Sequence, residues 1–182
     1  MSAVPTPNSR AIGAEPLPSR IGKCKTVNSN EPLIERVTSP EDVSAVAQLE
    51  ALCFTNPWTR EMLERELRES PVARVYALRE QGGEVAAFCS CWIVLDELHV
   101  NTIAVAPHRR REGLGTRLML HVMREAAEAG ATRATLEVRA SNTAARRLYS
   151  SLGFVETAVR QGYYTQPEED GIILWRGALS RG

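Results

Sequence analysis

The 182-residue sequence has few of the features that would place it beside a membrane or a polyanion. No apolar run approaches the roughly 18 residues that a membrane helix needs, and no compact apolar block of a secretory signal stands at the N-terminus. Lys plus Arg and Asp plus Glu number 22 each, so no overall charge favours nucleic acid or an anionic surface. We therefore expect a soluble, cytoplasmic protein with no membrane and no nucleic-acid partner.

Cysteine and histidine are also scarce, with four and three copies. Cys89 and Cys91 alternate onto one face of a predicted strand, and the scattered histidines have no metal-ligand spacing. We expect no metal site, and we expect the cysteines to be small buried residues in a reducing compartment.

Prolines are concentrated near the N-terminus. Residues 1–30 contain Pro5, Pro7, Pro16 and Pro18 with no periodic apolar face, which predicts a disordered tail. Basic residues outnumber the lone acid there, Glu15, and an organelle-targeting peptide is the alternative. Residues 31–182 suffice for a single domain with a substantial core.

Hydrophobic periodicity and turn signals predict the secondary structure of this domain. Helices are expected at 40–53, 59–69, 114–129 and from Asn142 to Gly153. Strands are expected at 33–37, 73–78, 84–94, 99–105, 134–139, 155–164 and 172–176, with a polar turn at 166–171. The order predicts an α+β fold, in which helices cover a mixed, mostly antiparallel sheet.

The segment from Asn101 to Phe154 contains a strand, a basic glycine turn, a helix, a strand and a second helix. Because the first helix begins inside the turn, unpaired backbone N–H groups and the positive end of the helix dipole face outward there. Gly113 and Gly115 would let an anion approach the backbone. The spacing matches neither a dinucleotide fingerprint nor a P-loop, so we expect a different diphosphate. Alone, the turn is equally compatible with a solvated surface loop.

Longer strings carry a family resemblance. Arg110–Gly115 (RREGLG) resembles the acetyl-CoA motif of the GCN5-related N-acetyltransferases (GNAT family). Three strings resemble its RimI-like ribosomal-protein-alanine N-acetyltransferases: Asn101–Val105 (NTIAV), Leu136–Asn142 (LEVRASN) and Leu148–Phe154 (LYSSLGF). The resemblance spans about Leu33 to Leu179. It implies the GNAT acyl-CoA N-acyltransferase fold, with helices on both faces of the sheet, and direct acetyl transfer from acetyl-CoA to the N-terminal alanine of a small-subunit ribosomal protein.

Such a transfer needs a base for the attacking amine. A protein N-terminus has a pKa near 8 and is largely protonated at neutral pH, so a carboxylate must accept its proton directly or through water. Glu137 alternates in its strand with Leu136 and Val138 and therefore emerges on the opposite face. The residues alone favour a solvated glutamate beside Arg139. The resemblance makes Glu137 the general base.

The departing thiolate needs a proton donor. The thiol resembles that of cysteine, whose pKa is about 8.5, and the pKa of tyrosine, near 10, is not far above it. Tyr149 lies on the short helix after the LEVRASN strand. A buried aromatic residue packed with Leu148 and Leu152 is an equal alternative from the residues alone. The resemblance makes Tyr149 the general acid.

The resemblance also implies the binding residues. Asn142 would contact acetyl-CoA as well as cap its helix. Backbone groups of the strand and the turn would hold the pantetheine arm and the diphosphate, and the residues are Ile103, Ala104, Val105, Arg110, Arg111, Glu112, Gly113, Leu114, Gly115 and Thr116. Aromatic residues would wall the acceptor groove, namely Phe54, Trp58, Tyr163 and Tyr164. Phe54 and Trp58 could equally plug the end of a helix pair. The role of Arg109, a solvated charge or an adenosine-phosphate contact, stays open.

Three positions depart from the family pattern. Arg110 stands where glutamine is frequent, and Gly162 stands where asparagine is expected before the paired tyrosines. Trp175 lies near the C-terminal end, where such a residue is not usual in the family. The differences concern the acceptor groove more than the cofactor site. Two alternatives are kept. One is an acetyltransferase that accepts a broader range of N-termini, lysine or small amines. The other is a non-catalytic acyl-CoA-binding module. The oligomeric state is open.

Overall fold

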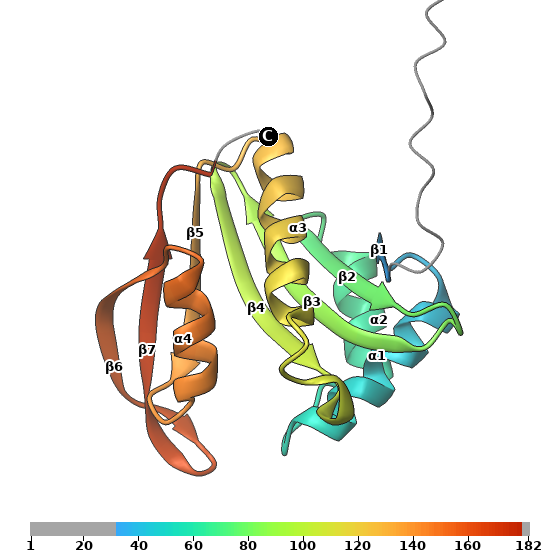
Figure 1. The fold of residues 1–182 in the computed structure, drawn as a ribbon, viewed down its shortest axis with the longest axis horizontal. Helices are drawn as coiled ribbons and strands as arrows, with labels where there is room; N and C mark the ends of the chain where they lie inside the picture. The colour runs from blue at the N-terminus through green and yellow to red at the C-terminus, as the bar shows by residue number, and fades with distance from the viewer. Residues whose placement is uncertain (1–31, 180–182) are drawn as a thin grey trace, which may run out of the picture.

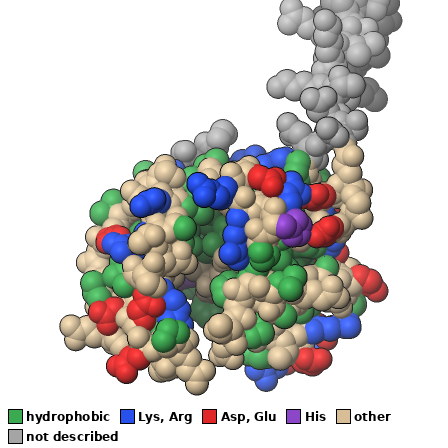
Figure 2. Space-filling model, turned by 60° about the horizontal axis from the view of Figure 1, so that its bottom comes forward, with side chains coloured by type: hydrophobic (Ala, Val, Ile, Leu, Met, Phe, Trp, Pro, Cys, Tyr) green, Lys and Arg blue, Asp and Glu red, His purple; other side chains and the backbone are tan. Residues whose placement is uncertain are grey.

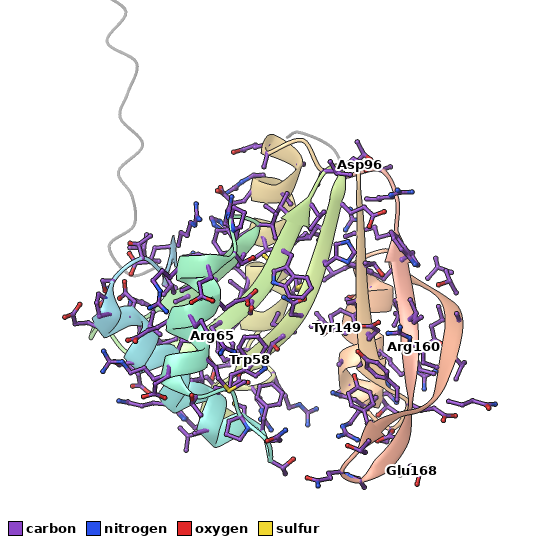
Figure 3. All side chains as sticks on the ribbon, turned by 180° about the vertical axis from the view of Figure 1, so that it is seen from behind. Trp58, Arg65, Asp96, Tyr149, Arg160 and Glu168 are labelled. Atoms are coloured by element: carbon purple, nitrogen blue, oxygen red, sulfur yellow. The ribbon has the colours of Figure 1, made fainter. Side chains whose placement is uncertain are left out.

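The computed structural model describes residues 32–179, so the predicted tail at 1–30 lies outside the described residues. The sheet has seven strands in the order β1-β2-β3-β4-β5-β7-β6. The strands are β1 (Leu33–Arg36), β2 (Ala73–Arg79), β3 (Val85–Val94), β4 (Glu97–Val105), β5 (Arg133–Arg139), β6 (Val155–Thr165) and β7 (Glu168–Arg176). The helices are α1 (Pro40–Cys53), α2 (Arg60–Glu69), α3 (Leu114–Glu128) and α4 (Thr143–Ser151), with a 3-10 turn, η1 (Pro107–Arg109). Helices α3 and α4 cover one face, and α1 and α2 cover the other (Figures 1 and 3).

Two apolar layers hold the helices on the sheet. On one face, Leu118 and Val122 of α3 are fully buried, as the helical periodicity predicts. On the other face, Val46 and Leu49 of α1 are buried against β2 and β3. Burying a side chain of this kind stabilises the fold by about 1.5–3 kcal/mol. The two layers therefore fix the sheet between its helices.

Strands β4 and β5 form the only parallel pair among the described strands. Their pairing runs from Glu97 opposite Arg133 to Val100 opposite Leu136 and then stops. Because β4 continues to Val105 and β5 to Arg139, the two strand ends diverge (Figure 1). A register shift between β3 and β4 near Ser90 accompanies the divergence. The backbone at the end of β4 is thus left unpaired on the side toward β5.

The predicted element bounds are confirmed to within a few residues, but the polar turn at 166–171 is wrong. Strand β7 begins at Glu168, which pairs with Thr165, and only Gln166 and Pro167 connect the two strands. The acidic start of β7 has low strand propensity, which obscured it in the sequence. Tertiary contacts compensate, because Glu169 accepts hydrogen bonds from Ser141 N–H and from Arg139. No helix within residues 32–179 is long and apolar enough to cross a membrane.

Candidate active site

A cavity of about 760 Å³ opens where β4 and β5 separate. Figure 2 shows the hollow from this end, with basic side chains along part of its rim. The end of α1, the end of β4, the turn before α3 and the first turns of α4 supply its walls. All of the predicted cofactor residues except Glu112 line it, namely Ile103, Ala104, Val105, Arg110, Arg111, Gly113, Leu114, Gly115, Thr116 and Asn142.

The N-terminus of α3 forms the most polar wall of the cavity. Gly113 is the N-cap with φ +79°, and Arg111 before it has φ +70°. A non-glycine residue in this region costs roughly 1–3 kcal/mol and persists where the surroundings impose it. Among the described residues, none of the backbone N–H groups from Gly113 to Thr116 donates a hydrogen bond. Free N–H groups at the positive end of a helix dipole are suited to binding a phosphate.

The three arginines of the turn have different partners. Arg109 forms ion pairs with Glu80 and with Glu112, and its Nη2 lies 2.7 Å from Oε2 of Glu112. The Arg109 guanidinium thereby holds the pKa of Glu112 below its ordinary value. Arg110 donates from Nε to the Val105 carbonyl at 3.2 Å. Among the described residues, Arg110 and Arg111 have no acidic partner, so their charges are available to an anion while that of Arg109 is neutralised.

Tyr149 projects from α4 and is 5% exposed. Its ring centroid lies 5.9 Å from that of Phe154, so the predicted aromatic packing is present. The residue also lines the cavity, and Figure 3 places it near the opening between β4 and β5. Within residues 32–179 its hydroxyl makes no hydrogen bond. Burial raises the pKa of Tyr149 well above its ordinary value, so the phenol stays protonated at neutral pH.

Asn142 is the N-cap of α4. Its side-chain oxygen accepts a hydrogen bond from Ala145 N–H at 3.1 Å, which confirms the predicted cap. The residue also lines the cavity. Both roles are geometrically compatible, because the cap uses the side-chain oxygen and leaves the amide nitrogen as a donor.

Glu137 lies on the opposite face of the sheet from Tyr149. Leu136 and Val138 are buried toward α3 and α4, so the Glu137 side chain points away from them and is 37% exposed. It does not line the cavity described above. Its carboxylate pairs with Arg160 of β6, with Nη1 2.7 Å from Oε1. The predicted neighbour, Arg139, instead pairs with Glu169 across the sheet at 3.3 Å, so the alternative of a glutamate beside Arg139 is wrong about the partner.

Tyr164 of β6 has a raised pKa. Burial first, and then nearby charges that include Glu137, raise the pKa of Tyr164. Tyr164 in turn adds, after burial and Cys89, to the rise in the pKa of Tyr149. The Arg139 guanidinium lies 4.1 Å from the centre of the Tyr164 ring, so Tyr164 stands beside the end of β5.

The four predicted acceptor-groove aromatics do not form one cluster. Phe54 lines the cavity, whereas Trp58 packs against the α1 core, and its N–H donates to Glu50 Oε1 at 3.3 Å. Trp58 therefore matches the alternative in which an aromatic plugs a helix pair. Tyr163 and Tyr164 pack edge to face at 5.1 Å on β6, outside the cavity lining.

Sequence reasoning missed several residues of the site. Cys53, Ala144, Ala145 and Leu148 also line the cavity. Leu148 belongs to the LYSSLGF string, which could have indicated it. Cys53 reaches the cavity only because α1 ends beside β4, where its thiol lies 3.7 Å from the Val105 carbonyl. Burial raises the pKa of this thiol, which disfavours the nucleophilic thiolate.

Glu50 of α1 is a further buried charged residue, at 4% exposure. One of its oxygens accepts the Trp58 N–H, and the other has no partner among the described residues. Burial raises the pKa of this carboxyl group. No three His, Cys, Asp or Glu side chains within residues 32–179 are grouped as metal ligands.

Comparison with known proteins identifies the class of this fold and cavity. The model of the acetyltransferase (GNAT) family matches residues 43–154, which is more than half of the chain. The chain therefore belongs to the GNAT family of acetyltransferases, and the predicted family, fold and enzyme class are confirmed.

Several relatives within the family are named as bacterial alanine N-acetyltransferases of a ribosomal protein. The chain is 38% identical over 136 residues to the [ribosomal protein bS18]-alanine N-acetyltransferase of Escherichia coli (strain K12), covering 73% of this chain and 89% of the relative. It is 38% identical over 141 residues to the enzyme of that name from Salmonella typhimurium, covering 76% and 93%. The crystal structure of the ribosomal-protein-S18-alanine N-acetyltransferase from Escherichia coli matches with a TM-score of 0.73 and 34% identity, covering 83% of this chain and 96% of that one. The RimI-like resemblance is confirmed.

Proposed function

We propose that this enzyme transfers an acetyl group from acetyl-CoA to the N-terminal alanine of a small-subunit ribosomal protein in the cytoplasm. The candidate acceptor is bS18, which the relatives at 38% identity modify according to their names. The observation that carries the proposal is the row of unpaired N–H groups from Gly113 to Thr116, at the mouth of a cavity that extends to Tyr149.

The residues fit acetyl-CoA along the length of the cavity. The diphosphate would accept hydrogen bonds from the free amides of α3 and ion-pair with Arg110 and Arg111. A Cβ added to Gly115 would lie 3.5 Å from Leu148 and 3.6 Å from Val105, and all three residues line the cavity. A larger side chain at this position would therefore occupy space that the cofactor needs. The pantetheine arm would bond the unpaired edge of β4 at Ile103–Val105, which places the thioester near Tyr149.

The chemistry follows from this placement. Glu137 accepts a proton from the N-terminal ammonium, directly or through water, and the neutral amine attacks the thioester carbonyl carbon. A C–N bond forms and the C–S bond breaks. Tyr149 gives its proton to the departing sulfur and regains one from the new amide nitrogen. The raised pKa of the Cys53 thiol favours this direct transfer over a cysteine-bound intermediate.

The acceptor would enter from the face that carries Glu137. Of the helices within residues 32–179, none covers β5, β7 and β6 there (Figure 3). Tyr163 is 44% exposed on β6, and Phe54 is 38% exposed on the other side of the opening. Together with Tyr164, they would flank a peptide that reaches the thioester from that side.

The test is acetylation of a peptide library with free N-terminal Ala, Ser, Met or Thr, followed by mass spectrometry and thiol release. We expect the highest kcat/KM for the alanine peptides that copy the bS18 N-terminus. Glu137→Gln should reduce kcat by about 10²–10⁴-fold while leaving acetyl-CoA affinity intact, because it removes the base alone. Preferred acetylation of lysine or a small amine would favour the broader enzyme, and no thiol release with any amine would favour a binding module.

A further inference from the structure

Arg160 holds the proposed base in an unusual arrangement. Its Nη1 lies 2.7 Å from Oε1 of Glu137, and its guanidinium carbon lies 4.8 Å from the centre of the Tyr163 ring. One guanidinium thus lies close to both a carboxylate and an aromatic ring. Anionic oxygens and aromatic faces both attract a cation, and an ammonium satisfies both requirements as well as a guanidinium does.

The backbone of β7 builds this cation site. Strand β7 lies between β5 and β6, with Gly171 opposite Arg160 and Ile173 opposite Glu137. A Cβ added at Gly171 would lie 2.9 Å from Cδ1 of Tyr163, so only glycine lets the ring rest there. The register shift of β6 between Arg160 and Tyr164 turns Tyr163 over that glycine. The arrangement is therefore specified by the hairpin.

The second arginine nearby is engaged elsewhere. Arg139 donates to the carbonyls of Gln166 and Pro167, pairs with Glu169 and lies over Tyr164 at 4.1 Å. The side chain of Arg160, in contrast, is 52% exposed and contacts Glu137 and Tyr163. Exposed pairs of this kind are weak, so another cation can replace Arg160 at little cost.

We propose that Arg160 is a specificity-determining residue that occupies the place of the acceptor's N-terminal ammonium, between Glu137 and Tyr163, and is displaced when the acceptor binds. The inference rests on the proposed function of Glu137. The exchange replaces one positive charge by another, so the carboxylate always has a counter-ion until it accepts the proton. The acetylated product carries no charge at its N-terminus, so it does not occupy the cation site, and Arg160 pairs with Glu137 again.

The test measures peptide binding to the CoA-saturated protein by calorimetry. One peptide begins with a free alanine, and its partner is the same peptide acetylated at the N-terminus. Arg160→Met removes the competing cation, so we expect the Kd of the free-amine peptide to fall by up to about fivefold. The Kd of the acetylated peptide should not change. Arg160→Lys, which keeps a cation, should restore a Kd near that of the original protein.

The chain offers a matched control in Arg133. This residue lies 2.7 Å from Glu97, is 50% exposed and covers the Trp175 ring at 5.6 Å, but stands at the closed end of the β4–β5 pair. Arg133→Met should leave both Kd values unchanged. A melting temperature for each variant, with Arg160→Gln as a second neutral replacement, separates misfolding from a change in the site.

The proposal is overturned if Arg160→Met leaves the free-amine Kd unchanged or raises it, if both peptides respond equally, or if the original protein binds neither. Failure of the proposed function is a different result: no thiol release with any peptide, or an unchanged kcat in Glu137→Gln. Because the calorimetric comparison requires no turnover, the two failures are distinguishable.

Discussion

Replacing Tyr149 with Phe tests the proposed general acid at a position where the effect on stability can be separated from the effect on turnover. The ring would keep its packing against Phe154, 5.9 Å between centroids, because only the hydroxyl is removed. Within residues 32–179 that hydroxyl makes no hydrogen bond, so its removal leaves no described protein group unpaired. We expect the free energy of unfolding to change by less than about 1 kcal/mol.

The effect on turnover should be much larger. General acid catalysis increases a rate by about 10²–10⁴-fold. Burial, however, raises the pKa of the Tyr149 phenol further above that of the leaving thiol, which is about 8.5. Proton transfer from the phenol to the thiolate is therefore uphill, so the hydroxyl first stabilises the developing thiolate through a hydrogen bond, and the proton passes to the sulfur as Tyr149 regains one from the new amide nitrogen. This places the loss in kcat near the lower limit, about 10²-fold, which corresponds to about 2.7 kcal/mol.

The assay is steady-state thiol release with an alanine-starting peptide, together with denaturant unfolding. Tyr76 provides the matched control, because it is 4% exposed in the same core but does not line the cavity. Tyr76→Phe should leave kcat within about twofold, since no acid is lost. An unchanged kcat in Tyr149→Phe, or an equal fall in both variants, would refute the reasoning.

Three further predictions address the anion site, the hairpin and pH. Gly113→Val places a β-branched residue at φ +79° and should weaken CoA binding at least about tenfold by calorimetry. Gly130→Val, which is also strained, at φ +106°, but lies beyond the other end of α3, should cost only stability. Arg139→Gln removes the hydrogen bonds to the carbonyls of Gln166 and Pro167. It should raise the KM of the peptide several-fold and leave the KM of acetyl-CoA unchanged. Equal rises in the two KM values would contradict this. Burial raises the pKa of Tyr76 to about 12, so above pH 10 the unfolded chain loses a proton that the native state keeps. The free energy of unfolding should therefore fall between pH 10 and 12. In Tyr76→Phe this fall should be smaller.

Local signals explain why much of the fold was predictable. Helix α1 is announced by Ser39, which accepts the Asp42 N–H at 3.1 Å, and by Pro40 at its first position. Helix α3 begins at Leu114, directly after its N-cap Gly113, as the glycine turn predicts, and buries the predicted face. These features depend on residues within one or two turns of each other, which a sequence displays directly.

The missed features depend on residues far apart in the chain. Glu137 and Arg160 are 23 positions apart, and they meet only because β7 inserts between their strands. Arg109 is neutralised partly by Glu80, which the β2–β3 turn brings close. Strand register is set by tertiary packing, so no local pattern could have identified these partners.

The measurement that tests the central claim most directly is a crystal structure with CoA and an alanine-starting peptide bound together. We expect the diphosphate on the N–H groups of Gly113–Thr116, the sulfur within hydrogen-bond reach of the Tyr149 hydroxyl, and the peptide amine within reach of Glu137 directly or through one water. A diphosphate bound elsewhere, or a sulfur remote from Tyr149, would contradict the account.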